Sequence, residues 1–332
     1  MNALVAALLV APASASFAKI VESVNAANTT WAAAAPARFG DVADVRRLCG
    51  AWTRDHAMYS SPALPEYEAN PFIAAIAAES LDWREAAPHC TVIAKIRDQS
   101  SCGSCWAFGS TETYEDRRCV ATGEDVEFST MDTAGCCSGF ACGLSRGCGG
   151  GQPTAALKWM TKTGVVSGAD YFEIGKGGSC KPYTFAPCAH HVAVTPEYPA
   201  CPEKEYEATC TRSCSEEKYG KKYADDKVAE GTAKSCRSVA AMMTALQKGP
   251  LSATLTVYED FPTYKSGVYR HVSGSALGGH AIEIIGYGTE EGTPYWLVKN
   301  SWNEMWGLGG TIKILRGSDE CGIESDVAAV DF

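Results

Sequence analysis

The sequence lacks three features that would place it in common classes of protein. After the first eighteen of its 332 residues, no run of eighteen uncharged apolar residues occurs, so no later segment is long enough to span a bilayer as a helix. Basic residues are few, with 29 Lys and Arg against 39 Asp and Glu and a net charge of −10. Since phosphate binding needs clustered cations, this balance argues against a nucleic-acid partner.

A second C-x-x-C pair is also missing. The only such pair is Cys102 and Cys105, in "DQSSCGSCWAFGS". A structural zinc site needs four N or S ligands close together, and the nearest other candidate, Cys210-x-x-x-Cys214, lies among its own crowded cysteines. We therefore expect no metal and no cofactor.

Cysteine itself is plentiful and points to an oxidising compartment. Sixteen cysteines occur, fifteen of them from Cys90 onward, which is too many for a reducing cytosol. Residues 1–18 carry no charge, are apolar from Ala3 to Ala11 and end in small residues, which predicts a secretory signal peptide rather than an N-terminal helix of the fold. The one N-glycosylation sequon, at Asn28, is compatible with this route.

The composition and the predicted secondary structure change along the chain. Residues 19–77 hold one cysteine, an Ala-rich run and the Pro-rich stretch "SSPALPEYEANP", and about sixty residues are marginal as a domain, so we predict a removable pro-segment cut near residues 75–80. Helix and loop patterns fill 78–175, and a polar, cysteine-punctuated stretch fills 180–236. Short β-type runs such as "LSATLTVY" follow residue 250. This order predicts an α+β fold, a helical half and then a sheet half, with a groove between them.

The C-x-x-C pair allows three interpretations: half of a zinc site, a redox dithiol, or a disulfide cysteine beside a cysteine that stays free. Ser104 stands where an N-cap would stand before "CWAFGSTETYEDRRCV", so Cys105 is predicted to be the first residue of a helix. The positive end of a helix dipole favours a thiolate, which is the nucleophilic form of cysteine.

A nucleophilic thiolate needs a base, and six histidines are available. His280 lies in a glycine-flanked, strand-like setting, "LGGHAIEIIGYG", from which a turn could aim the imidazole into a groove. A single histidine is more often an ordinary packed or solvated residue, so its position alone decides nothing. The order of several motifs decides the matter.

Four motifs in order resemble the papain superfamily of cysteine peptidases: "QSSCGSCWAFG", "GCGGG", "GGHAIEIIGYG" and "YWLVKNSWNEMWG". Within that superfamily, "IRDQ", the pair His190-His191 after Cys188, and "CGIES" resemble the cathepsin B branch. The resemblance implies a two-lobed fold over residues 78–332, with a helical N-terminal lobe, a β-barrel-like C-terminal lobe and the active-site cleft between them. It also implies that residues 19–77 inhibit the cleft until they are removed.

The resemblance assigns four catalytic roles. Cys105 is the nucleophile, His280 the general base and acid, and Asn300 orients the imidazole through its side-chain amide. Gln99 contributes its side-chain amide to an oxyanion hole together with the Cys105 backbone N–H. Trp302 would cover the His280–Asn300 contact from water.

The same resemblance implies a set of disulfides, which sequence alone cannot fix. Cys102 is then structural, and Cys49, Cys105, Cys236 and Cys321 stay free, with no role found for Cys236. The implied pairs are Cys90–Cys119, Cys102–Cys148, Cys136–Cys210, Cys137–Cys142, Cys180–Cys214 and Cys188–Cys201.

An insertion separates the two halves of the predicted site. Cys105 and His280 are 280 − 105 = 175 residues apart, more than the roughly 130 to 150 of papain-like enzymes. The stretch of about 180–214 accommodates the excess and resembles the loop with which cathepsin B binds a substrate's C-terminal carboxylate, through the residues matching His190 and His191. Of the two anchors of that loop, one is retained as His190 with Asp98. The other is missing, since no Arg stands between Cys188 and Cys201 and Met305 occupies the partner's position.

Three further residues are predicted to contact substrate. Asp326 stands where relatives often carry Glu at the floor of the S2 pocket, and could accept a basic side chain. Gly150 and Gly151, which lack Cβ, would let the substrate backbone approach closely. The expected partners are protein and peptide substrates, the chain's own pro-segment and cystatin-like inhibitors, and the expected location is an acidic lysosome-like compartment or the exterior.

Two alternatives stay open from the sequence. A thiol oxidoreductase would use "CGSC" as a dithiol, but such motifs usually follow a strand in a βαβ unit, which the chain does not show. A catalytically silent, disulfide-rich binding homologue is the other, and the presence of Cys105, His280, Asn300 and Gln99 disfavours it.

Overall fold

Helices dominate the first part of the chain and strands the last, as predicted. The computed structural model describes residues 15–60, 62–70, 72–73, 79–190, 193–204 and 206–332. The helices are α1 (Ala15–Ala26), α2 (Val42–Leu48), α4 (Trp83–Ala86), α5 (Thr91–Ala94), α6 (Cys105–Thr122), α7 (Thr130–Cys136), α8 (Pro153–Thr163), α9 (Tyr223–Asp226) and α10 (Val239–Leu246). The strands are β1 (Trp31–Ala33), β2 (Leu81–Asp82), β3 (Thr232–Cys236), β4 (Leu251–Tyr258), β5 (Tyr264–Tyr269), β6 (Ala276–Glu290), β7 (Thr293–Lys299), β8 (Thr311–Leu315) and β9 (Val327–Asp331).

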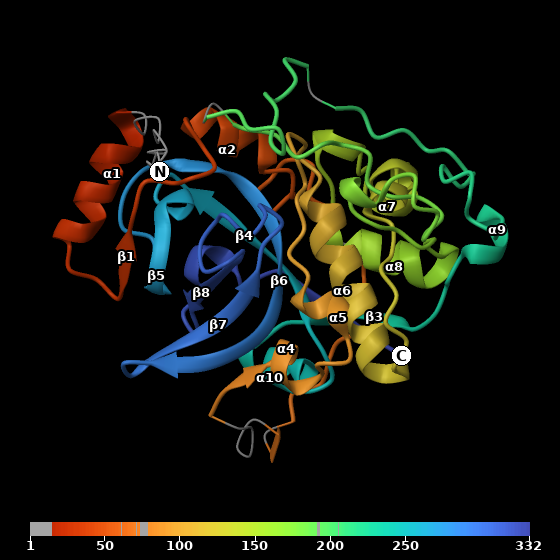
Figure 1. The fold of residues 1–332 in the computed structure, drawn as a ribbon. Coiled ribbons are helices and arrows are strands. Elements are labelled where there is room, and N and C mark those ends of the chain that lie inside the picture. The colour runs from red at the N-terminus through yellow and green to blue at the C-terminus, as the bar shows by residue number, and fades with distance from the viewer. Residues whose placement is uncertain (1–14, 61, 71, 74–78, 191–192, 205) are drawn as a thin grey trace, which may run out of the picture.

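The strands form one sheet in the order β1-β5-β8-β7-β6-β4-β9-β3, with β2 added beside β6. Pairing is antiparallel except between β5 and β8. The fifteen-residue strand β6 curves through the sheet (Figure 1). The sheet is open rather than a closed barrel, because its two end strands, β1 and β3, each pair on one side only. The expectation of a barrel-like lobe is corrected to this extent.

The two halves meet along α6. The helices α6, α7 and α8 gather on one side of the molecule and the sheet on the other (Figure 1). Trp106 and Ala107 of α6 share a buried apolar cluster with Ala281 of β6 and Ala328 of β9. Burial of this apolar surface joins the halves and places the first turn of α6 against strand β6.

The segment before residue 70 is docked on this body rather than separate from it. Strand β1 pairs with β5 at the edge of the sheet, and Phe17 of α1 and Trp31 are buried in the core of the sheet half. Helix α1 begins at Ala15, inside the predicted signal peptide, most of which (1–14) lies outside the described residues. The predicted cut near 75–80 also falls largely on residues 74–78, outside the described part.

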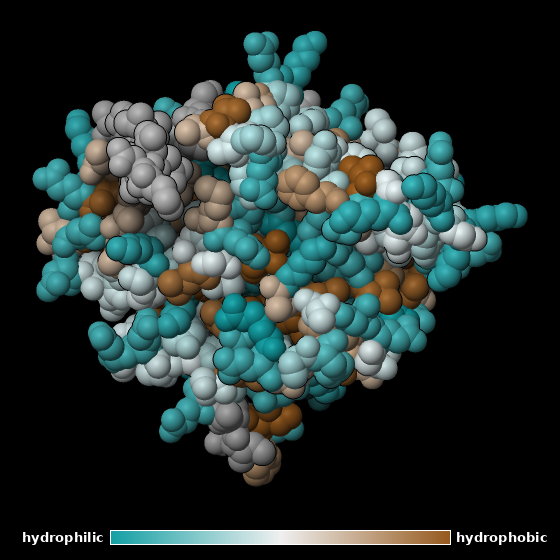
Figure 2. Space-filling view, viewed as in Figure 1, coloured by the Kyte–Doolittle hydropathy of each residue, from teal (hydrophilic) through white to brown (hydrophobic). Residues whose placement is uncertain are grey.

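The face of the molecule in Figure 2 carries mainly hydrophilic residues, with hydrophobic residues in small groups between them. Within the described part of the chain, no helix has both the length and the apolar composition needed to cross a membrane.

Candidate active site

Cys105 is the first residue of α6, as predicted, and lies at the junction of the two halves. Ser104 occupies the N-cap position but makes no capping bond, because its hydroxyl bonds Tyr183 at 2.9 Å instead. The Cys105 sulfur accepts the Gly50 backbone N–H at 3.2 Å, and the backbone N–H of Ala281, the residue after His280, lies close enough to lower its pKa. The thiol therefore faces strand β6 across the junction.

His280, Asn300 and Trp302 form one contact group on the sheet half. The Nε2 of His280 lies 2.8 Å from the Asn300 side-chain oxygen, and that oxygen also accepts the Ser301 N–H at 2.8 Å. An amide oxygen can only accept, so Nε2 carries the proton in the neutral imidazole. The Trp302 ring lies 4.8 Å from the imidazole, centroid to centroid, and all three side chains are buried. The other ring nitrogen, Nδ1, makes no hydrogen bond to a described residue.

Gln99 is fixed at the same junction by both ends of its amide. Its oxygen accepts from the Ser301 hydroxyl at 2.8 Å, so its nitrogen is directed toward acceptors: the carbonyls of Cys102 at 2.7 Å and of Leu48 at 3.0 Å. Leu48 belongs to the N-terminal segment. A backbone carbonyl of that segment thus occupies a donor that the sequence assigns to an oxyanion hole.

Burial suppresses the charges of the thiol and the imidazole in this state. It raises the pKa of Cys105 to about 11, although backbone N–H groups led by that of Ala281 oppose the shift. It also lowers the pKa of His280 to about 4, opposed by the Asn300 hydrogen bond. The helix dipole favours a thiolate, but desolvation under the N-terminal segment is the larger effect, so both groups are neutral here.

The N-terminal segment crosses the site as an added strand. Gly151 donates to the Gly50 carbonyl at 2.8 Å and accepts from Trp52 N–H at 3.0 Å, and Ala51 N–H bonds the Gly279 carbonyl at 3.0 Å. A Cβ on Gly151 would lie 2.5 Å from the Trp106 ring, so only glycine fits. Gly150 has φ of +102° and would place a Cβ 2.6 Å from the Trp52 indole nitrogen.

Asp326 lines a cavity of about 360 Å³ beside this segment. Arg54 and Tyr59 of the segment and the buried Cys236 contribute to its walls. Burial raises the pKa of Asp326, and the charge of Arg54 and a hydrogen bond from Tyr59 oppose that shift. One carboxylate oxygen, Oδ2, has no hydrogen-bond partner among the described residues. Burial also raises the pKa of the Cys236 thiol to about 12, so this cysteine is inert.

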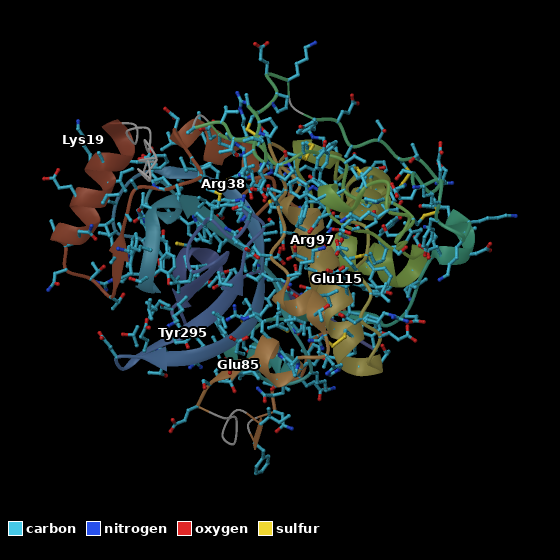
Figure 3. The ribbon with its side chains drawn as sticks, in the orientation of Figure 1. Lys19, Arg38, Glu85, Arg97, Glu115 and Tyr295 are labelled. Atoms are coloured by element: carbon cyan, nitrogen blue, oxygen red, sulfur yellow. A yellow bond between two sulfur atoms is a disulfide. The ribbon has the colours of Figure 1, made fainter. Side chains whose placement is uncertain are left out.

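The predicted loop anchor, Asp98, is occupied by an arginine of the N-terminal segment. Arg38 donates to both Asp98 carboxylate oxygens, at 2.8 and 2.6 Å, and to the Cys188 carbonyl at 3.0 Å. Ser100 N–H and the Asn303 amide complete the contacts of Asp98, at 2.7 and 3.0 Å. Arg38 is buried where the segment meets the helical half (Figure 3).

The loop histidines are only partly described. His190 is buried, its carbonyl accepts Gly40 N–H at 2.7 Å, and its ring lies 5.4 Å from that of Phe39. His191 lies outside the described residues. The N-terminal segment therefore contacts the base of the predicted carboxylate-binding loop, and the predicted His190–Asp98 pair stays a prediction for the chain without that segment.

All six implied disulfides are present, and the four cysteines expected to be free are free. Cys102 is bonded to Cys148, so the C-x-x-C pair is not a dithiol. This pairing leaves Cys105 as the free member.

Some residues of the site were missed from the sequence. Arg38, Leu48 and Gly50 act through position or backbone atoms, for which the sequence carries no motif, and Tyr183 bonds both Ser104 and the Gln99 carbonyl from 79 and 84 residues away.

The family described as "Papain family cysteine protease" matches residues 77–330. The chain belongs to this family. It is 41% identical to a "Cathepsin B-like cysteine proteinase" of Schistosoma japonicum over 305 residues, which is 90% of this chain and 85% of that one. It is 46% identical to "Cathepsin B-like cysteine proteinase 5" of Caenorhabditis elegans over 76% of this chain and 73% of that one.

Solved structures agree. "ProCathepsin B S9 from Trypanosoma congolense" superposes with a TM-score of 0.74 at 30% identity, covering 94% of this chain and 96% of that one. A digestive procathepsin L 3 of Tenebrio molitor larval midgut matches in fold alone, with a TM-score of 0.65 at 21% identity. The protein is thus a papain-family cysteine protease with cathepsin B-like relatives, and the Trypanosoma congolense neighbour, which covers 94% of this chain, is itself a proform.

Proposed function

We propose that this protease hydrolyses peptide bonds with Cys105 as nucleophile, His280 as general acid and base, Asn300 as the residue that orients the imidazole and Gln99 as an oxyanion-hole donor. The observation that carries this proposal is the 2.8 Å contact between His280 and Asn300, beside a thiol whose pKa the backbone N–H of Ala281 lowers. Because Nε2–H is held by Asn300, Nδ1 is the nitrogen that exchanges a proton with the sulfur.

The imidazole transfers a proton in each of the two steps of the reaction. The Cys105 thiolate attacks the carbonyl carbon while the imidazolium, through Nδ1, gives its proton to the departing amine, leaving a thioester on Cys105. Water then gives a proton to the neutral imidazole and attacks the thioester, which releases the acid product and restores the thiol. Gln99 and the Cys105 backbone N–H stabilise the oxyanion of each tetrahedral intermediate.

The N-terminal segment, taken as residues 19–77, acts as the inhibitor of this site. The Leu48 carbonyl accepts the side-chain N–H of Gln99. Gly50 and Trp52 make the backbone hydrogen bonds to Gly151 that a bound substrate would otherwise make. The Cys105 sulfur bonds the Gly50 N–H, so it faces an amide hydrogen rather than an attackable carbonyl carbon. This contact explains how the segment can lie in the site without being cut there.

Asp326 selects a basic side chain at the second position before the cut bond. This assignment is supported by a buried carboxylate that has one oxygen unbonded by any described residue and lies in a cavity that Arg54 also lines. Gly150 and Gly151 hold the substrate backbone beside this cavity, and Trp302 screens the His280–Asn300 contact. The other proposed partners are cystatin-like inhibitors, which would compete for the same strand position as Gly50–Trp52.

The loop carrying His190 and His191 adds peptidyl-dipeptidase activity to endopeptidase activity. Once Arg38 has left, Asp98 is available to anchor His190, and an imidazolium of the loop can bind a substrate's C-terminal carboxylate. The second anchor is absent: Met305, at the partner's position, is 48% exposed and cannot form an ion pair. An exposed ion pair contributes about 1 kcal/mol at most, enough to shift a two-state loop several-fold toward the open form that admits longer substrates.

Measuring dipeptide release against internal cleavage tests this activity. On His191→Ala we expect cleavage of a free-carboxylate peptide to fall about tenfold or more relative to a blocked, internally quenched peptide, because one charge-assisted hydrogen bond is lost. His89→Ala, at an exposed histidine outside the site, is the control. An unchanged ratio on His191→Ala would remove the loop from the reaction while leaving the peptidase activity in place.

The acidic, lysosome-like or exterior location is proposed on the six disulfides and on this imidazolium chemistry.

A further inference from the structure

Four charged side chains are buried together between α6 and the strands β6 and β7, and form what we call the Lys299 cluster: Glu112, Asp116, Glu283 and Lys299. The Lys299 ammonium lies 2.8 Å from an Asp116 oxygen, 2.7 Å from a Glu283 oxygen and 3.9 Å from a Glu112 oxygen. The side chains are between 0% and 2% exposed. Charges so fully removed from water persist only when they are paired or neutralised.

The cluster joins α6 and β6, which carry Cys105 and His280, with β7, which ends one residue before Asn300. Glu112 and Asp116 stand on α6, whose first residue is Cys105. Glu283 stands on β6, three residues after His280, and is paired in register with Lys299, the last residue of β7 and the neighbour of Asn300. One ammonium therefore spans the junction between the helix that carries the sulfur and the strand that carries the imidazole.

The cluster holds more carboxyl groups than cations. With all three ionised its net charge would be −2, counting one ammonium against the three carboxylates. The carboxyls of Asp116 and Glu283 both contact the same ammonium, and Glu112 Oε1, Asp116 Oδ1 and Glu283 Oε1 find no hydrogen-bond partner among the described residues. Buried carboxyl groups held so close together share a proton rather than both ionising.

Neighbouring cations do not balance the excess of carboxyl groups in the Lys299 cluster. Arg97 lies close to the cluster but is bound by Glu127 at 3.1 Å, Asp170 at 3.0 Å and Glu115 at 3.8 Å; Figure 3 shows Arg97 and Glu115 together beside α6. Arg117 gives its N–H groups mainly to backbone carbonyls, among them that of Gly249 at 2.8 Å, and approaches Asp331 at 3.3 Å. In the described part of the chain, Lys299 is thus the cation that contacts the three carboxyls directly.

We propose that the Lys299 cluster is a proton-dependent positioning device: with a proton shared among its carboxyls it holds α6, β6 and β7 in the register that places Cys105 opposite His280, and loss of the proton loosens that register. This inference rests on the proposed roles of Cys105 and His280. Lys299, Glu283, Asp116 and Glu112 act through the elements they join and do not touch substrate.

The direction of the pH effect follows from the protonated state. Burial raises the pKa of Glu112 to about 7, opposed by the Lys299 charge, and burial likewise raises the pKa values of Asp116 and Glu283. Burial would lower the pKa of Lys299, but the Asp116, Glu283 and Glu112 charges outweigh it and raise that pKa. Carboxyls with raised pKa values stabilise the fold fully below their ordinary values, and the contribution is lost as pH rises through about 7.

Glu283→Gln tests the device, since it replaces a carboxyl by a neutral group of the same shape. Glu290→Gln is the matched control, because Glu290 is on the same strand and pairs with Lys313 at 2.7 Å, but near the surface. Two quantities are measured from pH 5 to pH 8: the thermal unfolding midpoint of the full chain, and the rate of Cys105 alkylation by iodoacetamide in the activated protein. Asp116→Asn repeats the test if Glu283→Gln does not fold.

The lowered pKa of His280 makes the covered chain more stable as pH rises, and it does so equally in all three proteins. The change in midpoint from pH 5 to pH 8 should therefore be more positive for Glu283→Gln than for the wild type and the control, by about 3 °C or more. The alkylation rate at pH 7.5 relative to pH 5 should also differ at least about threefold between Glu283→Gln and the control, after correction for the folded fraction. If the unfolding midpoint changes with pH equally in Glu283→Gln and in the control, the proposal that the carboxyls share a proton is overturned. A more positive change in midpoint with an unchanged alkylation ratio overturns the positioning role. Absence of Cys105 alkylation in the activated wild type overturns the proposed function instead.

Discussion

Cys105 is one of four cysteines outside the disulfides, and its surroundings separate it from the other three. Burial raises the pKa values of Cys49, Cys236 and Cys321 as well, but Cys105 alone of these begins a long helix and bonds the backbone beside a histidine. The motif order identified this residue from sequence. The state of its thiol could not be predicted, because it depends on a segment that covers it from more than fifty residues away.

Gln99→Ala tests the oxyanion hole at this scale. We expect kcat to fall about 10²- to 10³-fold with little change in KM, because the amide contributes about 2.7 to 4 kcal/mol that is felt in the transition state rather than in the bound substrate. Steady-state kinetics of the activated protein on a peptide substrate measure both constants. Gln247→Ala is the control, since its amide bonds Tyr287 at 3.3 Å, away from the site. A rise in KM with kcat unchanged would assign Gln99 to substrate binding.

The types of the elements were predictable where the pattern is local. The run "LSATLTVY" is strand β4 as written, and α6 begins at the expected cysteine. Strands β1 and β3 were not predicted, because each is short and forms only by pairing with a distant strand, β5 and β9 respectively. The expected β-barrel-like lobe is present as an open sheet, and the sequence could not show whether that sheet closes, because strand composition does not reveal which edges meet.

The ion pair between the N-terminal segment and Asp98 gives a prediction at the scale of elements. Arg38→Gln should weaken inhibition of the activated protease by a separately made segment about 100-fold, because the Asp98 carboxylate is left without its cation in a site where both side chains are nearly buried. The inhibition constant of the segment measures this effect. Lys19→Gln, at an exposed residue of α1, is the matched control for lost charge (Figure 3). Equal inhibition by the Arg38→Gln and Lys19→Gln segments would show that the ion pair does not hold the segment in place.

At the scale of the whole molecule, the covered site and the bulk pH are linked through His280. Burial lowers the pKa of His280 from 6.5 to about 4. Between these pH values the imidazole is therefore neutral when the N-terminal segment covers the site and protonated when the segment is absent. A lowered pKa stabilises the covered form fully above pH 6.5, and this contribution is lost as pH falls toward 4. Low pH therefore weakens binding of the N-terminal segment even before the segment is cut.

The inhibition constant of the separate segment should accordingly rise about tenfold or more between pH 6.5 and pH 4.5. Titration of inhibition across this range measures the effect, and Glu290→Gln, which changes a carboxyl outside the covered site, is the control. An inhibition constant that stays the same or falls as pH is lowered would show that protonation of His280 does not weaken binding of the segment.

The central claim is that one sulfur, Cys105, performs the chemistry once the N-terminal segment has gone. The direct measurement is labelling with a peptidyl fluoromethyl ketone or epoxide at pH 5.5, with the modified residue located by mass spectrometry and residual activity followed in the same samples. We predict that Cys105 alone is modified in the activated protein, that activity falls in proportion to its modification, and that the full chain reacts at least about 100-fold more slowly. Activity that survives complete modification of Cys105, or that is lost through modification of Cys236, would contradict the account.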